Sequence, residues 1–450
     1  MAFTPQQAIL ELGPAFYDPV TAARFPQTIL RFRNDRAAAG IGLDGLSDEQ
    51  WIAHFGRFEP LPGALTKPLA LRYHGHQFRV YNPEIGDGRG FLFAQMTDTA
   101  GRLMDLGTKG SGQTPYSRFG DGRLTLKGGV REILATEMLE ALGVETSRTF
   151  SLIETGEELH RGDEPSPTRS AVLVRLSHGH IRIGTFQRLA YSQETENIAK
   201  LTAYVLHHYY GEEAGDDAPQ RLLAHVARRT ARMAGRIMAA GFVHGVLNSD
   251  NINVTGESFD YGPWRFAPSW APRFTAAYFD QAGLYSFGRQ PEAIYWDVMQ
   301  LASSLRLIAE EAPLIEAMDV FPETFQREVA EAMLWRLGLV PRGTDDDRAL
   351  VGAIERALVE TGTPIDRLFF DGFGGALPES YGEPFADLRA QLAHFTPRKP
   401  RDHPYWSDPA PCSMLIDEVE SIWDAIAQAD DWSLLDAKVA AIRRMGEALA

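Results

Sequence analysis

One stretch constrains the fold of this chain more than any other: residues 244–262, HGVLNSDNINVTGESFDYG. It opens with a His-Gly pair, places Asn251 seven positions after His244, and closes on Asp260 followed by Tyr and Gly. Asn and Asp offer the hard oxygen ligands that Mg²⁺ takes in proteins, and a glycine lets the backbone turn beside a metal. Both residue types also favour ordinary turns, so the stretch by itself fits an incidental surface loop equally well.

The spacing follows the pattern of protein kinases, which carry H-R-D-x-x-x-x-N and then D-F-G at this point of the chain. In that pattern the Asn and the second Asp hold the Mg²⁺ that bridges the nucleotide phosphates. Val246 stands where a kinase has its catalytic base, and its side chain cannot accept a proton. Asp250, immediately before Asn251, is the carboxylate that remains. The stretch therefore predicts a site for metal and nucleotide whose base is displaced.

Two features upstream occur in the order that a kinase requires. Gly86, Gly88 and Gly90 form the cluster GDGRG just before the apolar run FLFAQM, and Arg89 within it is suited to pair with phosphate. We expect FLFAQM and the following RLMDLGTKG to be the two strands of a hairpin, with Lys109 at the end of the second strand. A glycine cluster alone is usually no more than a turn.

The segment after Lys109 has helical periodicity over VREILATEMLEALG, which carries Glu132 and Glu137. In kinases a glutamate of this helix holds the strand lysine on the phosphates. The two acids lie five positions apart, about 140° around a helix, so they cannot both face one cleft. Beyond the helix, a predicted hairpin carries Arg175 and Arg182, which offer a clamp for a triphosphate.

These signals predict an α+β, two-lobed protein-kinase-like fold with an N-terminal extension and helical C-terminal additions. We expect residues 1–64 to form the extension, 65–185 a strand-rich N-lobe, and 186–450 a mostly helical C-lobe with closing helices. An extended linker is expected over 398–411. Helices are expected over 198–211, 220–241, 291–311, 324–338, 346–360, 413–429 and 432–449.

Composition narrows the functional class. Lys and Arg number 44 against 60 Asp and Glu, a formal charge of −16, which argues against general nucleic-acid binding. Cys412 is the only cysteine, so no intrachain disulfide can form. The N-terminal segment has neither a basic region nor a long apolar run, so we expect no signal peptide, no membrane span and a cytoplasmic protein.

These motifs resemble the selenoprotein O family of kinase-like protein adenylyltransferases. The resemblance covers roughly residues 69–265, through the runs RYHGHQF, GDGRG, DLGTKGSGQTPYSRFGDGR, VREILATEMLEALGV, HIRIGTFQ, HGVLNSDNI and DYGP. It implies a kinase fold that binds ATP in a flipped orientation, with the α-phosphate toward the acceptor. AMP is then joined to a Ser, Thr or Tyr hydroxyl of a protein substrate, and pyrophosphate is released.

The resemblance also implies a role for individual residues. Asp250 is the implied proton acceptor, and Asn251 and Asp260 are the implied ligands of Mg²⁺ or Mn²⁺. It selects Glu132, and not Glu137, as the partner of Lys109. The implied nucleotide-binding set is Gly86, Gly88, Arg89, Lys109, Glu132, Asp121, Gly122, Arg175, Arg182 and Asp260.

Two positions depart from the family pattern. Arg79 replaces the glycine of the family's HQFG, and we expect only a local surface change. Many family members carry a selenocysteine or cysteine near the C-terminus, whereas this sequence ends IRRMGEALA. Redox control of the family kind is therefore in doubt, because Cys412 is the sole thiol.

Two other functions stay open. The first is protein uridylyl transfer from UTP, because contacts to the phosphates and the metal do not distinguish one nucleotide base from another. A non-catalytic pseudokinase that binds nucleotide as a scaffold is the other, and Val246 taken alone favours it. The joint presence of Lys109, Glu132, Asp250 and Asn251 with Asp260 argues for an enzyme, because a scaffold does not need metal ligands.

Overall fold

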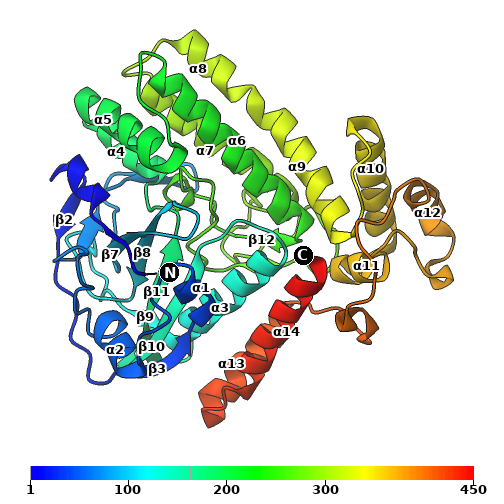
Figure 1. The fold of residues 1–450 in the computed structure, drawn as a ribbon, viewed down its shortest axis with the longest axis horizontal. Helices are drawn as coiled ribbons and strands as arrows, with labels where there is room; N and C mark the ends of the chain where they lie inside the picture. Colours follow the sequence, from blue (N-terminus) through cyan, green and yellow to red (C-terminus); the bar gives the residue numbers. More distant parts are fainter. Residues whose placement is uncertain (1, 163) are drawn as a thin grey trace.

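A computed structural model describes residues 2–162 and 164–450. The chain is a mixed α/β protein in which one antiparallel sheet lies beside a large helical region, with further helices extending from them (Figure 1). The main path of the sheet runs through β2 (Tyr17–Pro19), β4 (Leu69–Leu71), β7 (Leu92–Thr97), β8 (Leu103–Lys109), β11 (Thr168–Ser177), β10 (Arg148–Leu159) and β3 (Ile29–Arg33). Short strands β1 (Pro5–Gln6) and β9 (Leu124–Thr125) pair with β7 and β11.

The predicted hairpin is confirmed as β7 and β8, which pair antiparallel. Its turn forms because the Asp98 carboxylate accepts the backbone N–H groups of Ala100 and Arg102, each at 2.9 Å. Every residue of β8 is buried, since β7 and β11 flank it on both sides. This burial fixes Lys109, the last residue of β8, opposite Leu173 of β11.

The helix predicted after Lys109 is α3 (Leu126–Ala141), and it packs on β10 and β11. Thr125 caps its N-terminus by accepting the Gly128 N–H at 3.1 Å. Gly129 allows close packing, because a Cβ there would lie 2.3 Å from Leu152 of β10. The outer side of α3 is covered by the C-terminal helices α13 (Ile416–Ala429) and α14 (Ser433–Leu449).

The helical region is organised around α6 (Ala218–Ala239), which packs against the three helices α7 (Gln290–Leu305), α8 (Glu311–Met318) and α9 (Val320–Arg336). None of the helices in the described part of the chain is both long and apolar enough to span a membrane. The remaining helices of this region are α4 (Ile183–Tyr191), α5 (Thr195–Val205), α10 (Thr344–Thr361), α11 (Ile365–Asp371) and α12 (Ala386–Leu392). Two small two-stranded sheets are β5 (Gly75–Gln77) with β6 (Val80–Asn82), and β12 (Phe242–Val243) with β13 (Arg265–Phe266).

The first 64 residues form part of the main sheet and do not only pack against its outside. They supply β1, β2 and β3 to the sheet and the helices α1 (Asp35–Ala39) and α2 (Asp48–Phe55). Trp51 of α2 is fully buried and stacks on Phe150 of β10 at a centroid distance of 4.7 Å. The sequence did not show this, because strands of two to five residues carry little periodicity.

Two further segments differ from the sequence expectation. The helix expected over 291–311 ends at Leu305, and α8 begins separately at Glu311. Arg79 has a backbone φ of +62°, which suits the glycine of the family pattern. Its guanidinium pairs with Glu292 at 3.2 Å and lies over the Trp296 ring, so the substitution links the β5–β6 hairpin to α7.

We expect Arg443→Ala to lower the free energy of unfolding by about 2 kcal/mol. Arg443 of α14 donates two hydrogen bonds, at 2.7 and 2.8 Å, to the buried Glu137 carboxylate of α3, and the variant leaves that charge poorly compensated. Arg444→Ala is the matched control, because its partner Asp408 is one-third exposed and solvent screens their ion pair, so this variant should lose much less stability. Urea unfolding measures the free energy of unfolding of both variants. Equal decreases would contradict a larger contribution from the buried pair of Arg443 and Glu137.

Candidate active site

A cleft of about 830 Å³ lies between the sheet and the 244–262 segment. It collects residues that are far apart in the sequence, from the glycine cluster, β8, β11 and the loop of 113–123. Glu132 alone of the predicted set does not line it, because this residue is buried behind Lys109. The predicted residues that do line it are Gly86, Gly88, Arg89, Lys109, Asp121, Gly122, Arg175, Arg182, Asp250, Asn251 and Asp260.

Asp260 is the centre of charge at the inner end of the cleft. One carboxylate oxygen accepts a short hydrogen bond from Arg175, and the other accepts one from Arg182 at 2.8 Å. The Lys109 ammonium is 3.8 Å away. Burial alone would raise the pKa of Asp260, but the charges of Arg175, Arg182 and Lys109 hold it well below its ordinary value. Asp260 is therefore an ionised carboxylate surrounded by cations.

The backbone at Asp260 is in the left-handed region, with φ at +61°. This conformation is uncommon for a residue other than glycine and costs about 1–3 kcal/mol. The ion pairs with Arg175 and Arg182 offset that cost and orient the carboxylate toward the cleft.

Lys109 forms a buried ion pair with Glu132 of α3. Glu137, five residues further along the helix and about 140° around it, faces away from the cleft and pairs with Arg443 of α14. Helix geometry thus directs one acid of α3 toward the cleft and the other toward the C-terminal helices. The position of the Lys109 ammonium consequently depends on how α3 sits on the sheet.

Arg182 connects three walls of the cleft. Its guanidinium lies 4.3 Å from the Tyr73 ring centroid and 4.8 Å from that of Phe259. It donates a hydrogen bond to the Asp250 carbonyl at 2.9 Å and pairs with Asp87 at 3.3 Å. No sequence pattern singles out Tyr73, Asp87 or Phe259 as site residues, although Asp87 lies within the glycine cluster and Tyr73 within the RYHGHQF run.

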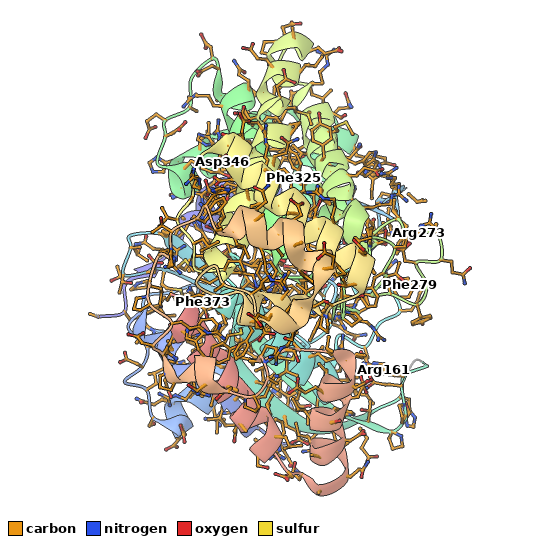
Figure 2. All side chains as sticks on the ribbon, turned by 90° about the vertical axis from the view of Figure 1, so that its right-hand side faces the viewer. Arg161, Arg273, Phe279, Phe325, Asp346 and Phe373 are labelled. Atoms are coloured by element: carbon orange, nitrogen blue, oxygen red, sulfur yellow. The ribbon has the colours of Figure 1, made fainter. Side chains whose placement is uncertain are left out.

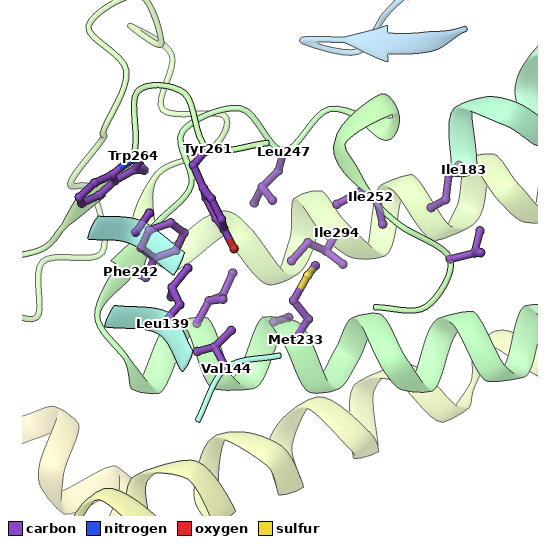
Figure 3. Packing of buried hydrophobic residues seen from close by; sticks show 14 of the residues in the cluster. Leu139, Val144, Ile183, Met233, Phe242, Leu247, Ile252, Tyr261, Trp264 and Ile294 are labelled. Atoms are coloured by element: carbon purple, nitrogen blue, oxygen red, sulfur yellow. The ribbon is translucent and has the colours of Figure 1, made fainter. Parts of the chain in front are cut away.

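Apolar side chains anchor the 244–262 segment from below. Leu247, Ile252 and Tyr261 point into the core beside α6 and α7 (Figure 3). Asn248, Asp250, Asn251 and Asp260 of the same segment line the cleft. His244 is buried, and one of its ring nitrogens contacts the Phe259 carbonyl at 2.9 Å. Burial lowers the pKa of His244, so this imidazole is neutral and joins the two ends of the segment.

Asp250 is a buried carboxylate at the floor of the cleft. Its Oδ1 atom has no hydrogen-bond partner among the described residues, and it packs against Gly75, where a Cβ would lie 2.8 Å away. Burial raises the pKa of Asp250 to about 6, against the opposing charge of Arg182. Val246, at the position of the kinase base, also lines the cleft but cannot accept a proton. The carboxylate that could take this role is that of Asp250.

The donor atoms fit a hard divalent cation. Asn251 donates its amide N–H to the Val246 carbonyl at 2.9 Å, which leaves Oδ1 as its available ligand atom. Asp260 is ionised and lines the same cleft, and Asp250 adds an oxygen without a partner. Residues 2–162 and 164–450 contain no group of three or more His, Cys, Asp or Glu that could hold a metal. Mg²⁺ needs no such group, because it takes one or two protein ligands together with phosphate and water.

The glycine cluster serves close packing between two loops. Tyr116 lies over Gly86, where a Cβ would be 2.5 Å from its ring, and Ser117 donates a short hydrogen bond to the Gly88 carbonyl. Asp121 and Gly122 belong to this same covering loop. Asp121 is tied to Arg161 by hydrogen bonds of 2.8 and 3.1 Å. The glycines thus have a packing role that the sequence analysis did not foresee.

Comparisons with known proteins show the family of this chain. A family model described as protein adenylyltransferase SelO matches residues 1–372. A protein from Synechococcus elongatus named protein nucleotidyltransferase YdiU is 42% identical, over 99% of this chain and 96% of its own length. Proteins of the same name from a Synechocystis species and from Aeromonas salmonicida are 49% and 37% identical, over 75% and 77% of this chain and 71% of their own length in each case.

We expect Asp260→Ala to lower the free energy of unfolding by about 3 kcal/mol, because the buried Arg175 loses its carboxylate partner and the buried Arg182 keeps only the longer pair with Asp87. The exposed pair of Asp121 with Arg161 supplies the control, and Asp121→Ala should cost less than about 1 kcal/mol. Chemical denaturation of both variants measures the difference. A loss at Asp260 no larger than that at Asp121 would contradict the assigned role of the carboxylate.

Proposed function

This chain belongs to the SelO family of protein adenylyltransferases, and from that membership we propose that it transfers AMP from ATP to Ser, Thr or Tyr hydroxyls of proteins and releases pyrophosphate. It is a nucleotidyltransferase. The observation that carries the finer proposal is the distribution of charge in the cleft. Lys109, Arg175 and Arg182 surround Asp260. The Asp250 carboxylate lines the same cleft and has an oxygen without a hydrogen-bond partner among the described residues.

The overall arrangement that we propose is that of a two-lobed kinase. The N-lobe would span 65–185 with the sheet and α3, residues 1–64 would add to it, and the C-lobe with its closing helices would span 186–450. A strand lysine that is paired with a helix glutamate and lies 3.8 Å from Asp260, with both Lys109 and Asp260 lining the cleft, supports this proposal. Such pairs recur in enzymes that act by positioning phosphates.

The inner end of the cleft would bind the terminal phosphates of ATP. Lys109, Arg175 and Arg182 are all buried there, and a buried cation cluster is costly unless anions compensate it. Asp260 contacts all three cations, Glu132 and Asp87 pair with Lys109 and Arg182, and a polyphosphate would supply further anionic partners. With the β- and γ-phosphates inward, the α-phosphate is the phosphate left facing Asp250, which is the orientation that AMP transfer requires.

The proposed reaction is an in-line displacement at the α-phosphorus. The acceptor hydroxyl oxygen forms a bond to the α-phosphorus while the bond from that atom to the bridging oxygen of pyrophosphate breaks. Asp250 accepts the hydroxyl proton, a contribution of about 10²–10⁴ in rate. Lys109, Arg175 and Arg182 stabilise the charge that develops on pyrophosphate as it leaves. Val246 needs no role in proton transfer.

We assign the metal site to Asn251 and Asp260. Mg²⁺ or Mn²⁺ held there would neutralise charge on the nucleotide phosphates. Asn251 contributes the oxygen that its bond to Val246 leaves available. Asp260 now divides its two oxygens between Arg175 and Arg182, so binding of cation and phosphate would redistribute these contacts.

Uridylyl transfer from UTP remains the second candidate. The contacts at the inner end are ion pairs and hydrogen bonds among charged side chains, and these would hold any nucleoside triphosphate. A scaffold without activity is less well supported, because it gives no reason to retain an orphaned buried oxygen on Asp250.

Incubation with radiolabelled nucleotides tests the proposed reaction. We expect label from α-³²P-ATP to appear on protein substrates and label from γ-³²P-ATP not to appear. The Asp250→Asn variant should lose about 10²–10⁴ of the rate while it still binds ATP. Transfer of the γ-label alone would identify a kinase, and stronger transfer from α-³²P-UTP would favour the second candidate. No transfer across many protein substrates would favour the scaffold.

The two acids of α3 give a matched pair of variants. Glu132→Gln should lower kcat/KM by about a hundredfold, because Lys109 loses the partner that positions its ammonium. Glu137→Gln should lower kcat/KM by less than about tenfold, since this acid faces Arg443 and affects the cleft only through the position of the helix. Steady-state kinetics of both variants, with folding checked by circular dichroism, makes the comparison. A larger loss at Glu137 would reverse the assignment.

A further inference from the structure

The outer end of the cleft contains a side chain that the proposed reaction does not use. Phe119 lines the cleft and is fully exposed. Most large apolar side chains of the chain are at least partly covered, so an aromatic ring held in water at the edge of a cleft points to a ligand that covers it. Its neighbours at this end are Arg118 and His160, both exposed, and the half-buried Tyr116.

The loop that carries Phe119 is held in place rather than free. Gln113 donates a hydrogen bond to the Gly120 carbonyl at 2.8 Å, and the Gly120 N–H reaches the Ser117 carbonyl at 2.7 Å, which closes the turn around Phe119. Thr114 bonds the Asp87 carbonyl at 2.5 Å. Together with the ion pair of Asp121 and Arg161, these contacts fix the base of the loop and leave the Phe119 ring as its projecting part.

A view of the side chains places this end on the outside of the molecule. Arg161, to which the Phe119 loop is tied through Asp121, lies along the same edge as Phe279 and Arg273 (Figure 2).

The two ends of the cleft differ in chemistry. The inner end is lined by the charged side chains of Lys109, Arg175, Arg182 and Asp260 and suits phosphates. The outer end offers the rings of Phe119 and Tyr116 beside the exposed Arg118 and His160. A nucleoside triphosphate has the same division, with a polyanion at one end and an aromatic base at the other.

We propose that Phe119 stacks on the base of the bound nucleotide and makes the outer end of the cleft the base subsite. This inference rests on the proposed function, because it takes the triphosphate to lie at the inner end. Phe119 then contributes to the choice between ATP and UTP, since the larger purine ring overlaps more of an aromatic side chain than a pyrimidine does. Arg118, which forms no ion pair in the described part of the chain, lies next to it.

Binding measurements with and without the base test this subsite. Isothermal titration of the full chain with ATP, UTP and inorganic tripolyphosphate, at one Mg²⁺ concentration, separates contacts to the base from contacts to the phosphates. Phe119→Ala should weaken ATP binding about tenfold, weaken UTP binding less, and leave tripolyphosphate binding unchanged. Phe119→Trp should retain ATP binding. Since Phe119 is fully exposed, neither variant disturbs the core.

Tyr278→Ala is the matched control, because this ring is also exposed but does not line the cleft, and its ATP affinity should equal that of the unaltered chain. An unchanged ATP affinity in Phe119→Ala would overturn the base subsite while the proposed function stands. An equal loss of tripolyphosphate binding would also overturn it, because the ring would then act on the phosphate end. Failure of the unaltered chain to bind any nucleotide would overturn both.

Discussion

The ion cluster around Asp260 is the interaction on which the rest of the site depends. A carboxylate in the left-handed backbone region holds Arg175 of β11 and Arg182 of the following turn, with Lys109 of β8 beside them. Each cation is buried and would be costly alone. Together they join the sheet to the 244–262 segment, so the contact that positions the chemistry also connects the two halves of the molecule.

Two supports hold this cluster in place. Beneath the 244–262 segment, apolar residues such as Leu247 and Tyr261 extend into the core beside α6 and α7, while Asp250, Asn251 and Asp260 of the same segment line the cleft. On the other side, α3 presents Glu132 to Lys109 and Glu137 to Arg443 of α14. The family model ends at residue 372, whereas α14 lies beyond it and still contacts the helix that positions Lys109.

Features of local sequence were predictable, and features made by distant contacts were not. The β7–β8 hairpin and α3 follow from apolar periodicity and from a turn closed by Asp98. The pairing of Lys109 with Glu132 rather than Glu137 needed the family resemblance, since helix geometry showed only that both could not face the cleft. The bond between Glu137 and Arg443 joins positions 306 residues apart, and no pattern along the chain signals it. Likewise the sequence around Gly86 predicts a phosphate-binding loop, whereas the close contact of Gly86 with Tyr116 is visible only in the structure.

The orientation of the nucleotide is the central claim, and a crystal structure with Mg²⁺ and a non-hydrolysable ATP analogue tests it most directly. The account predicts the γ-phosphate at the inner end, within hydrogen-bond distance of Lys109, Arg175 or Arg182, with the α-phosphate facing Asp250 and the base at the outer end. An adenine ring at the inner end, with the γ-phosphate toward the cleft mouth, would be the orientation of an ordinary kinase and would contradict it.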